Sequence, residues 1–475
     1  MIKRRSIFIL VLAVTLGLMG CGGEEPVNGG DEPGPGIDAG SDVGDDPGGG
    51  SDVSDGDGSG DDESDSGCVE DCTHEVARGL FMSEELLERA RERAELSQEP
   101  FATSYSIQSG RANSALDREA DPFVMEDMSD ITFGWISGGE GTLSEATSKL
   151  EADSDRIRTL ALEYVLTSEE QFADKALDLM RVWAVEHTPV NIYYFNPDFS
   201  SAQIDGQTEG FHSDRPWNFA LDAMWQAYGL INISDAYLLL TRNGYMLNGD
   251  DDEVIREWIL SLTEAVNSSF HAWTRWADEH PNAGSYERYR SDNHLSWSLA
   301  GLIAGAAALE DQELAAYVLS GGSWYDREAG EYENPSYIRD VIERAIEGDQ
   351  EGELGRIYEE RIERDPPVGY SFFHLWAIVI VAQVAEVHFD DNLWSYQGAV
   401  GGSIEDAFDR YAAFVLGERE SPVPEQDGDM EGLSWHFEVA FHQFDKERYR
   451  QAVEQLDRHR FIVQSWGPLA LLFGE

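Results

Sequence analysis

Two short segments of the sequence place polar side chains directly before long apolar runs. An amide and an imidazole stand side by side at Asn293 and His294, and a guanidinium and a phenol stand at Arg364 and Tyr370. A tyrosine has a pKa of about 10, so a neighbouring cation is needed before its phenolate becomes accessible. Arg364 is close enough in sequence to share a loop with Tyr370. An amide donor, an imidazole, a guanidinium and a phenol thus all precede apolar runs that we expect to form inner helices, which makes these four residues candidates for a site.

Each of these residues also has a purely structural explanation. Asn293 could cap the helix that we expect to begin near His294, since Asn is a favoured N-cap. His294 could be a hydrogen-bonded histidine at a helix start, and Tyr370 a core aromatic with its hydroxyl at the surface. Arg364 could merely form ion pairs, and Arg361 could take its place in the site. Its acidic neighbours in sequence are Glu359, Glu360 and Glu363.

The elements that must position this site are helices. Apolar residues recur every three or four positions, as at Phe172, Ala176, Met180 and Trp183, whereas alternating strand patterns are scarce. Antiparallel helices joined by short links predict an all-α fold, an (α/α) toroid of about five to six helical hairpins. We expect helices over residues 83–96, 155–166, 169–187, 216–240, 253–266, 294–309, 336–347, 371–387 and 404–416. Long polar loops are expected at residues 101–140, 188–215, 271–293 and 421–434.

The amino terminus is typical of an exported lipoprotein. A basic start, Met1 to Arg5, precedes an apolar stretch over residues 7–19 that suits a signal peptide. The stretch ends in Gly20-Cys21, which resembles a bacterial lipobox, so residues 1–20 are expected to be removed and Cys21 to carry lipid. Lipid chains bind a membrane by burying hydrocarbon, at about 0.8 kcal/mol per CH₂. This predicts a location at the outer membrane, in the periplasm or at the cell surface.

Residues 21–67 form an expected tether between the lipid and the fold. From residue 22 to 67 the chain holds 15 acidic residues, no Lys or Arg and no aromatic residue. Such a segment cannot bury enough apolar area to offset chain entropy, so we expect it to be disordered and extended by self-repulsion. Cys68 and Cys72 follow, and in an oxidising compartment they favour a local disulfide over zinc, for which only His74 is a nearby further ligand.

The charge balance excludes several partners. The formal net charge is −59, to which the signal segment contributes +3 and the tether −15, so residues 68–475 carry −47. A surface this acidic repels nucleic acid and anionic membranes, which leaves the lipid as the only expected membrane contact. If the substrate is a polyanion, the cleft must be locally basic.

Three segments of the chain resemble the alginate lyase family of polysaccharide lyases. Residues 160–183 resemble the family's early helical hairpin, residues 291–309 its Asn-Asn-His signature, and residues 358–386 its Arg-then-Tyr segment. A weaker match begins at residues 196–203. Together the matches run in family order over residues 145–390. The resemblance implies that residues 68–475 form a catalytic domain that cuts a uronate polymer, alginate first, by β-elimination without a cofactor or a metal.

The resemblance also implies roles for the residues that opened this section. Elimination needs donors that neutralise the substrate carboxylate, a base for the C5 proton and an acid for the leaving oxygen. Asn293 and His294 match the neutralising pair, and Arg364 the arginine that supports it. Tyr370 matches the tyrosine that takes the C5 proton and returns one to the bridge oxygen.

The sequence departs from the family pattern at two places. The first Asn of the signature is Asp292 here, and a carboxylate beside a carboxylate-binding site would be repulsive unless it pairs with Arg288 or Arg290. Pro366 and Pro367 lie between Arg364 and Tyr370, which could change the backbone path.

Further side chains are expected to bind substrate. Asn196 and Gln203 are candidate donors, Arg288 and Arg290 are candidate cations, and Trp217 and Trp435 offer aromatic faces on which sugar rings stack. His436 and Glu438 are additional cleft candidates beside Trp435.

Two other functions remain open at this point. An inverting glycoside hydrolase would need two carboxylates about 6.5–9.5 Å apart across a cleft, and the acidic residues are too abundant to exclude it. A glycan-binding lipoprotein that has lost the chemistry is the non-enzymatic alternative, favoured by Asp292. GxSxG, P-loop, HExxH and Rossmann motifs are absent from the sequence.

Overall fold

The computed structural model describes most of the chain after residue 77. The described residues are 78–124, 143–190, 217–279, 290–327, 330–348, 353–364, 366–424, 430–455, 458–459 and 467–475. The chain divides into two units, Met1–His74 and Glu75–Glu475, and all described residues belong to the second. The expected signal peptide, lipobox, tether and disulfide, including Cys21, Cys68 and Cys72, therefore lie outside the described residues.

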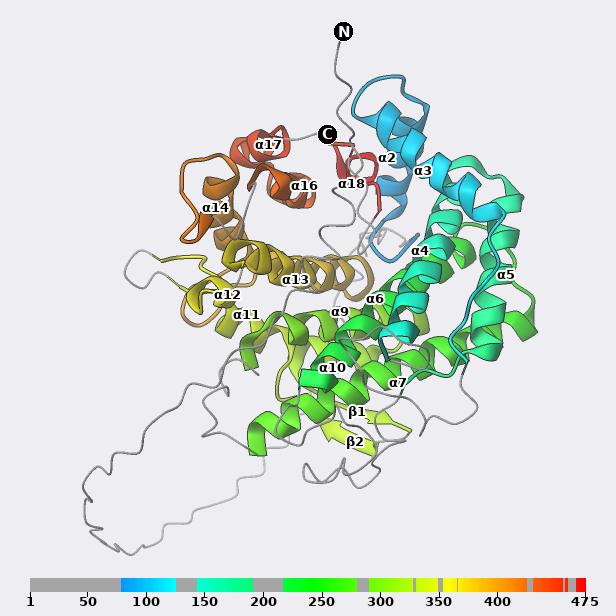
Figure 1. Cartoon of the computed structure of the whole chain (residues 1–475), viewed down its shortest axis with the longest axis horizontal. Coiled ribbons are helices and arrows are strands. Elements are labelled where there is room, and N and C mark those ends of the chain that lie inside the picture. The colour runs from blue at the N-terminus through cyan, green and yellow to red at the C-terminus, as the bar shows by residue number, and fades with distance from the viewer. Residues whose placement is uncertain are drawn as a thin grey trace, which may run out of the picture. The chain divides into compact units, whose positions relative to one another are not determined.

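The second unit is built almost entirely from helices (Figure 1). Its elements are α2 (Glu84–Glu95), α3 (Phe101–Leu116), α4 (Leu143–Thr167), α5 (Glu170–Glu186), α6 (Trp217–Thr241), α7 (Gly249–Glu279), α9 (Asn293–Leu309), α10 (Gln312–Ser320), α11 (Ile338–Ala345), α12 (Tyr358–Arg361), α13 (Pro367–Phe389), α14 (Ile404–Val415), α16 (Phe437–Phe444), α17 (Glu447–Val453) and α18 (Leu469–Phe473), with short 3-10 turns η3 (Leu393–Ser395) and η4 (Met430–His436). An antiparallel hairpin, β1 (Ser323–Asp326) and β2 (Gly330–Glu333), pairs Trp324 with Tyr332.

Four inner helices pack side by side in the order α4, α6, α9 and α13. The helices α3, α5, α7 and α10 cover them from outside, each against an inner neighbour. Helix α9 is buried from Asn293 to Ala308. Helix α13 is long and apolar enough to cross a membrane, but 89% of its most apolar window is buried inside the fold. It is therefore a core helix, and its apolar sequence reflects packing on all sides.

The ring of helices closes where the end of the chain meets its beginning. Helix α18 packs against α2 and α3 (Figure 1). Arg93 on α2 is buried, and its Nη1 donates to the carbonyl oxygens of Leu471 and Leu472 at 3.1 and 2.9 Å. These carbonyls belong to a five-residue helix that cannot satisfy them internally, so a distant guanidinium supplies the missing donors.

Several expected boundaries are wrong. Residues 101–116 form α3, although we expected a loop there, because its buried face uses small and polar side chains such as Ser104, Gln108 and Ala112. Gln108 donates to the carbonyl of Thr159 at 2.9 Å, so a hydrogen bond replaces the apolar contact that periodicity detects. Helices α4 and α7 also extend beyond the predicted 155–166 and 253–266, to Leu143–Thr167 and Gly249–Glu279.

Glycine residues allow the inner helices to approach closely. A Cβ atom at Gly301 on α9 would lie 2.5 Å from the Cβ and 2.9 Å from the Cα of Ala227 on α6. At Gly229 on α6 it would lie 2.5 Å from Leu150 on α4. Because the Gly301 clash involves backbone, it can be relieved only by separating α6 from α9.

We predict that Gly301→Ala lowers the free energy of unfolding by about 1–3 kcal/mol, the usual cost of overpacking a core. The matched control is Gly110→Ala on the exposed face of α3, where a Cβ meets nothing within 4 Å. There the same substitution should raise the free energy of unfolding by about 0.5–1 kcal/mol, since Ala is the better helix former. Denaturant titration of both variants measures the difference, and equal effects would contradict this account of the α6–α9 contact.

The buried side chain of His187 makes the free energy of unfolding depend on pH. Its ring is buried between Trp183 and Trp258, and Trp258 Nε1 donates to its Nδ1 at 3.1 Å. Burial lowers the pKa of His187 from 6.5 to about 3. The unfolded chain therefore binds a proton in a pH range where the folded chain does not.

The contribution of neutral His187 to the free energy of unfolding should be complete above pH 6.5. It should be lost as the pH falls from 6.5 toward 3. Its slope would approach about 1.4 kcal/mol per pH unit. His187→Asn keeps an acceptor for Trp258 without the proton site, so its unfolding free energy should fall less steeply over this range. Parallel slopes for parent and variant, measured by urea titration at a series of pH values, would exclude the linkage.

Candidate active site

The first turn of α9 is held by Asp292, the residue that departs from the family pattern. Asp292 is fully buried and caps the helix, with its Oδ1 accepting from the backbone N–H of His294 at 3.0 Å. The predicted cap, Asn293, is instead the first helical residue. The other oxygen of Asp292 lies 3.1 Å from His294 Nδ1. The expected repulsion is thus avoided, because the carboxylate serves the helix terminus and the imidazole.

The Asp292 carboxylate determines which nitrogen of His294 carries the proton. A carboxylate accepts only, so Nδ1 is protonated and Nε2 is the nitrogen left for other partners. Orientation of an imidazole by a carboxylate is common at functional sites. His294 itself is only 3% exposed, so the cap and the packing together restrict its ring.

Asn293 is held from the opposite side by Glu359 on α12. Oε1 of Glu359 accepts from the backbone N–H of Asn293 at 2.9 Å and from its Nδ2 at 3.1 Å. Oε2 lies 2.8 Å from Nδ1 of His374 on α13. All three residues are buried, and they join α9, α12 and α13. The sequence had indicated Glu359 only as a possible ion-pair partner of Arg364, and nothing in it indicated the bonds to Asn293 and His374.

Arg364 and Tyr370 lie together, as their spacing predicts. The guanidinium carbon of Arg364 lies 4.1 Å from the centroid of the Tyr370 ring, which is 7% exposed. Pro367 occupies the first helical position of α13 and Pro366 is its extended N-cap, so the two prolines start the helix that carries Tyr370. A cation at this distance favours negative charge on the phenol.

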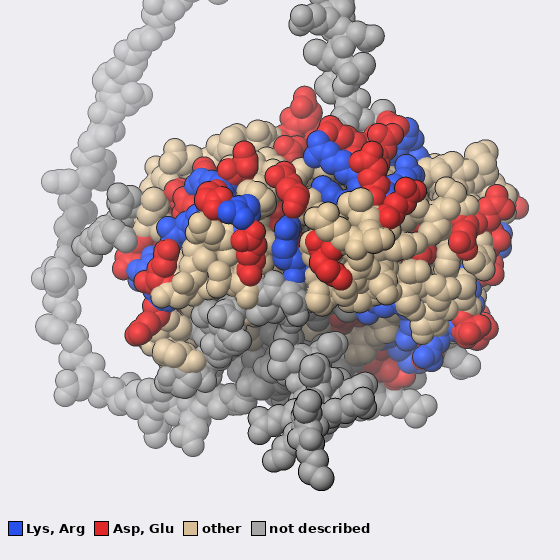
Figure 2. Space-filling view, turned by 90° about the horizontal axis from the view of Figure 1, so that it is seen from above, with Lys and Arg blue, Asp and Glu red and all other residues tan. Residues whose placement is uncertain are grey.

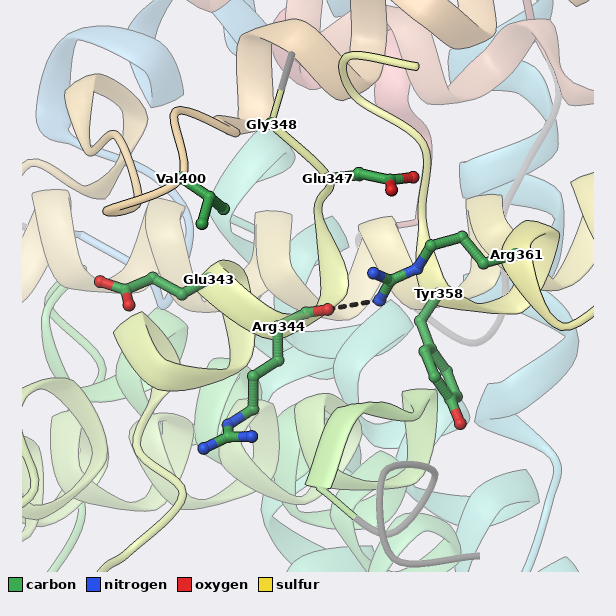
Figure 3. A pocket seen from close by; sticks show the side chains of 7 residues that line it. All are labelled: Glu343, Arg344, Glu347, Gly348, Tyr358, Arg361 and Val400. Carbon is green, nitrogen blue, oxygen red and sulfur yellow. Dashed lines mark hydrogen bonds between the residues drawn. The ribbon is translucent and has the colours of Figure 1, made fainter. Parts of the chain in front are cut away.

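Arg361, the alternative to Arg364, points elsewhere. Its guanidinium lies 5.2 Å from the ring of Tyr358 and donates to the backbone carbonyl of Arg344 (Figure 3). Both side chains line a separate pocket of about 440 Å³, together with Glu343, Glu347, Gly348 and Val400. The geometry therefore pairs Arg364, and not Arg361, with the phenol.

A chain of aromatic rings joins the helices that carry these residues. Tyr370 contacts Phe373, Phe373 contacts Trp297 on α9, and Trp297 contacts Tyr228 on α6, with centroid distances of 6.4, 5.0 and 4.7 Å. Trp297 lies three residues after His294, and Phe373 three after Tyr370, so the first turns of α9 and α13 lie side by side. Burial, and then the charges of Glu151 and Tyr370, raise the pKa of Tyr228, a neighbour that the sequence did not reveal.

The expected substrate-binding residues are only partly described. Asn196, Gln203 and Arg288 lie outside the described residues, and for Trp217 only the backbone, at the start of α6, is described. Arg290 is 5% exposed and donates to the carbonyl of Pro335 at 2.7 Å.

The carboxyl-terminal cleft candidates are placed by packing. Trp435 is half-buried and packs edge-on against Trp376 at 4.9 Å. His436 Nδ1 lies 2.8 Å from the carbonyl oxygen of Leu433. The prediction that Glu438 faces a cleft is wrong: it is 1% exposed and bonded by Arg458 through both oxygens at 2.9 Å.

Charges of both signs are interspersed on one face of the molecule (Figure 2). On the face in Figure 2, Lys and Arg side chains lie among Asp and Glu rather than in one basic patch. Lys149, for example, pairs with Asp121 and Glu145. Exposed pairs of this kind contribute little to stability, but they keep the few cations dispersed.

Comparison with known proteins connects this arrangement to one family. A family model described as alginate lyase matches residues 130–421. The fold is similar to that of an alginate lyase from Bacteroides ovatus, with a TM-score of 0.55 and 17% identity, over 84% of this chain and 99% of that one. Alginate lyase A1-III from Sphingomonas species A1 gives a TM-score of 0.48 and 13% identity, over 82% and 94%. No curated protein sequence matches. The predicted (α/α) toroid is confirmed.

The pairing of Asp292 with His294 has a direct spectroscopic consequence. In Asp292→Asn the new side chain can still cap α9 through its oxygen, but it presents an N–H to Nδ1 of His294. We predict that the neutral ring of His294 then carries its proton on Nε2 instead of Nδ1. Nitrogen-15 shifts of histidine-labelled protein at alkaline pH, assigned with His294→Gln, report the change. An unchanged tautomer in the variant would show that Asp292 does not orient the ring.

Proposed function

The chain belongs to the alginate lyase family and is a polysaccharide lyase, and we propose that it cleaves a uronate-containing polysaccharide, alginate first, by β-elimination. The observation that carries this proposal is the placing of Asn293 and His294 beside the Arg364–Tyr370 pair, through the contact of Trp297 with Phe373. An amide, an imidazole and a cation-supported phenol then face one substrate. That is the set of groups that elimination from a uronate requires.

Each group has one task in the proposed reaction. The Asn293 amide donates to the carboxylate at C5, and so does Nε2 of His294 when the ring is protonated on both nitrogens, with Nδ1 held by Asp292. Both donors stabilise the negative charge that develops there. Tyr370, with Arg364 over its ring, takes the C5 proton, and the electrons of that C–H bond form the C4–C5 double bond. The bond from C4 to the bridging oxygen breaks as the oxygen receives a proton from Tyr370. The products are a new non-reducing end with an unsaturated uronate and a shortened polymer.

The net negative charge of the chain is compatible with a polyanionic substrate only if cations in the cleft offset the negative potential of the rest of the protein. Residues 68–475 carry −47, so a polyuronate is repelled at long range in dilute salt. Turnover is therefore expected to increase with moderate salt, which screens the surface, before high salt weakens substrate binding.

We also propose a cellular location for this activity. The basic start, apolar stretch and Gly20-Cys21 junction support export and lipidation at Cys21, with residues 22–67 as an acidic tether. The lyase would then act at the periplasmic or outer face of a membrane, where extracellular polysaccharide arrives.

The test of the proposed function is ultraviolet absorbance in the band of a C4–C5 unsaturated uronate. Residues 75–475 would be given alginate, its mannuronate-rich and guluronate-rich blocks, pectate and a glycosaminoglycan. We expect a rise on alginate that His294→Ala and Tyr370→Phe lower by about 100-fold or more. A folded protein that produces reducing ends without absorbance would be a hydrolase, and one that binds without turnover a glycan-binding protein.

The two arginines give a matched comparison within the same assay. Arg364→Ala removes the cation over Tyr370, so it should lower kcat by about 100-fold. Arg361→Ala removes a side chain that faces the separate pocket, so it should leave kcat within about threefold of the parent. The reverse order of effects would transfer the supporting role to Arg361.

A further inference from the structure

Glu359 is a buried carboxylate that its surroundings do not explain as a structural ion pair. It is 0% exposed and lies on the single turn of α12. Among the described residues its side chain bonds only to Asn293 and to His374, at 2.9, 3.1 and 2.8 Å. A buried carboxylate is costly unless it is fully hydrogen-bonded. The first N–H of α9, at the positive end of that helix, supplies part of the compensation.

The next residue, Glu360, shows what a structural carboxylate looks like at this position. Its oxygens accept from Arg410 Nε at 2.9 Å and from the Tyr411 hydroxyl at 2.9 Å, so a fixed cation neutralises it. Both glutamates are buried on the same short helix, but only Glu359 faces the first turn of α9. Glu360 is therefore a structural ion-pair partner of Arg410, whereas the bonds of Glu359 indicate a role in holding Asn293.

We propose that Glu359 is a positioning residue of the lyase reaction, acting through Asn293 and supported by His374. The inference rests on the proposed function, in which the Asn293 amide binds the substrate carboxylate. Glu359 holds the backbone and the side-chain nitrogen of Asn293 with the same oxygen, which fixes both the helix terminus and the plane of the amide. It also determines which end of the amide is the nitrogen, because a carboxylate can accept only from N–H.

This orientation leaves the amide prepared for an anion. Nδ2 of Asn293 has two hydrogens, and Glu359 uses one, so the second is available to a substrate carboxylate. Oδ1 of Asn293 is buried and has no hydrogen-bond partner among the described residues. If the amide were rotated by 180°, Oδ1 would take the place of Nδ2 beside Glu359 and the substrate carboxylate. Both carboxylates would then repel it.

His374 completes the arrangement from α13. Its ring is 0% exposed, with Nδ1 at Glu359 and Nε2 without a partner in the described part of the chain. Because Glu359 accepts, His374 Nδ1 donates, and the bond restrains the carboxylate in the plane that Asn293 needs. His374 is four residues after Tyr370, so the same helix carries the phenol and the support of the amide.

The test is a double-mutant cycle on the purified chain, with alginate as substrate and kcat and KM measured separately. Glu359→Gln keeps the size but can accept on only one side, so kcat should fall by about 10- to 100-fold, with KM within about threefold. In the Asn293→Ala background the same substitution should lower kcat by less than about threefold, because the group that it positions is absent. Glu360→Gln, the control, should lower the melting temperature while its effect on kcat stays within about threefold in both backgrounds.

A second pair of variants decides the matter if Glu359→Gln does not fold. His374→Asn places an N–H near the position of Nδ1 and should keep kcat within about threefold, whereas His374→Leu should lower it about tenfold. Equal kcat values for these two, or independent effects of Glu359→Gln and Asn293→Ala, overturn the positioning role while the parent remains a lyase. A folded parent without any lyase activity overturns the proposed function and this inference with it.

Discussion

Complete burial of α9 is the constraint on which the site depends. Every residue from Asn293 to Ala308 is buried, so the free N–H groups of the first turn must find their partners within the protein. The N–H of Asn293 donates to Glu359, that of His294 to Asp292, and that of Leu295 to the Asp292 carbonyl. The partners that satisfy the backbone also hold the two side chains that chemistry requires. The same carboxylates therefore hold both the helix terminus and the reactive side chains.

The sequence predicts the parts of this site that arise from local pattern. The apolar runs after His294 and Tyr370 give α9 and α13, and the closeness of Arg364 to Tyr370 follows from their spacing. The partners of Asn293 are not predictable in this way, because Glu359 is 66 residues away and lies in an acidic run where any member could serve. Helix α3 was missed for a related reason: its buried side is polar, and its stability depends on contacts such as Gln108 with the Thr159 carbonyl.

The family pattern and the structure also differ usefully at Asp292. As a sequence change, an acid beside a carboxylate-binding site favours loss of activity. In the structure both oxygens of Asp292 are directed to His294 and the backbone, and the charge is placed at the positive end of α9. Whether the Asp292 side chain is favourable depends on the direction in which its carboxylate points, and a sequence does not give that direction. The family assignment therefore does not depend on the identity of this residue.

The contact between α18 and α2 determines when, during synthesis, the ring of helices can close. Arg93 finds its acceptors, the carbonyls of Leu471 and Leu472, 378 and 379 residues further along the chain, so both segments must have been made before the bonds can form. Until then the ring has an open edge, and the apolar side chains beneath α2 have no cover. The ring of helices therefore cannot close until synthesis has passed Leu472, however early α2 and α3 form.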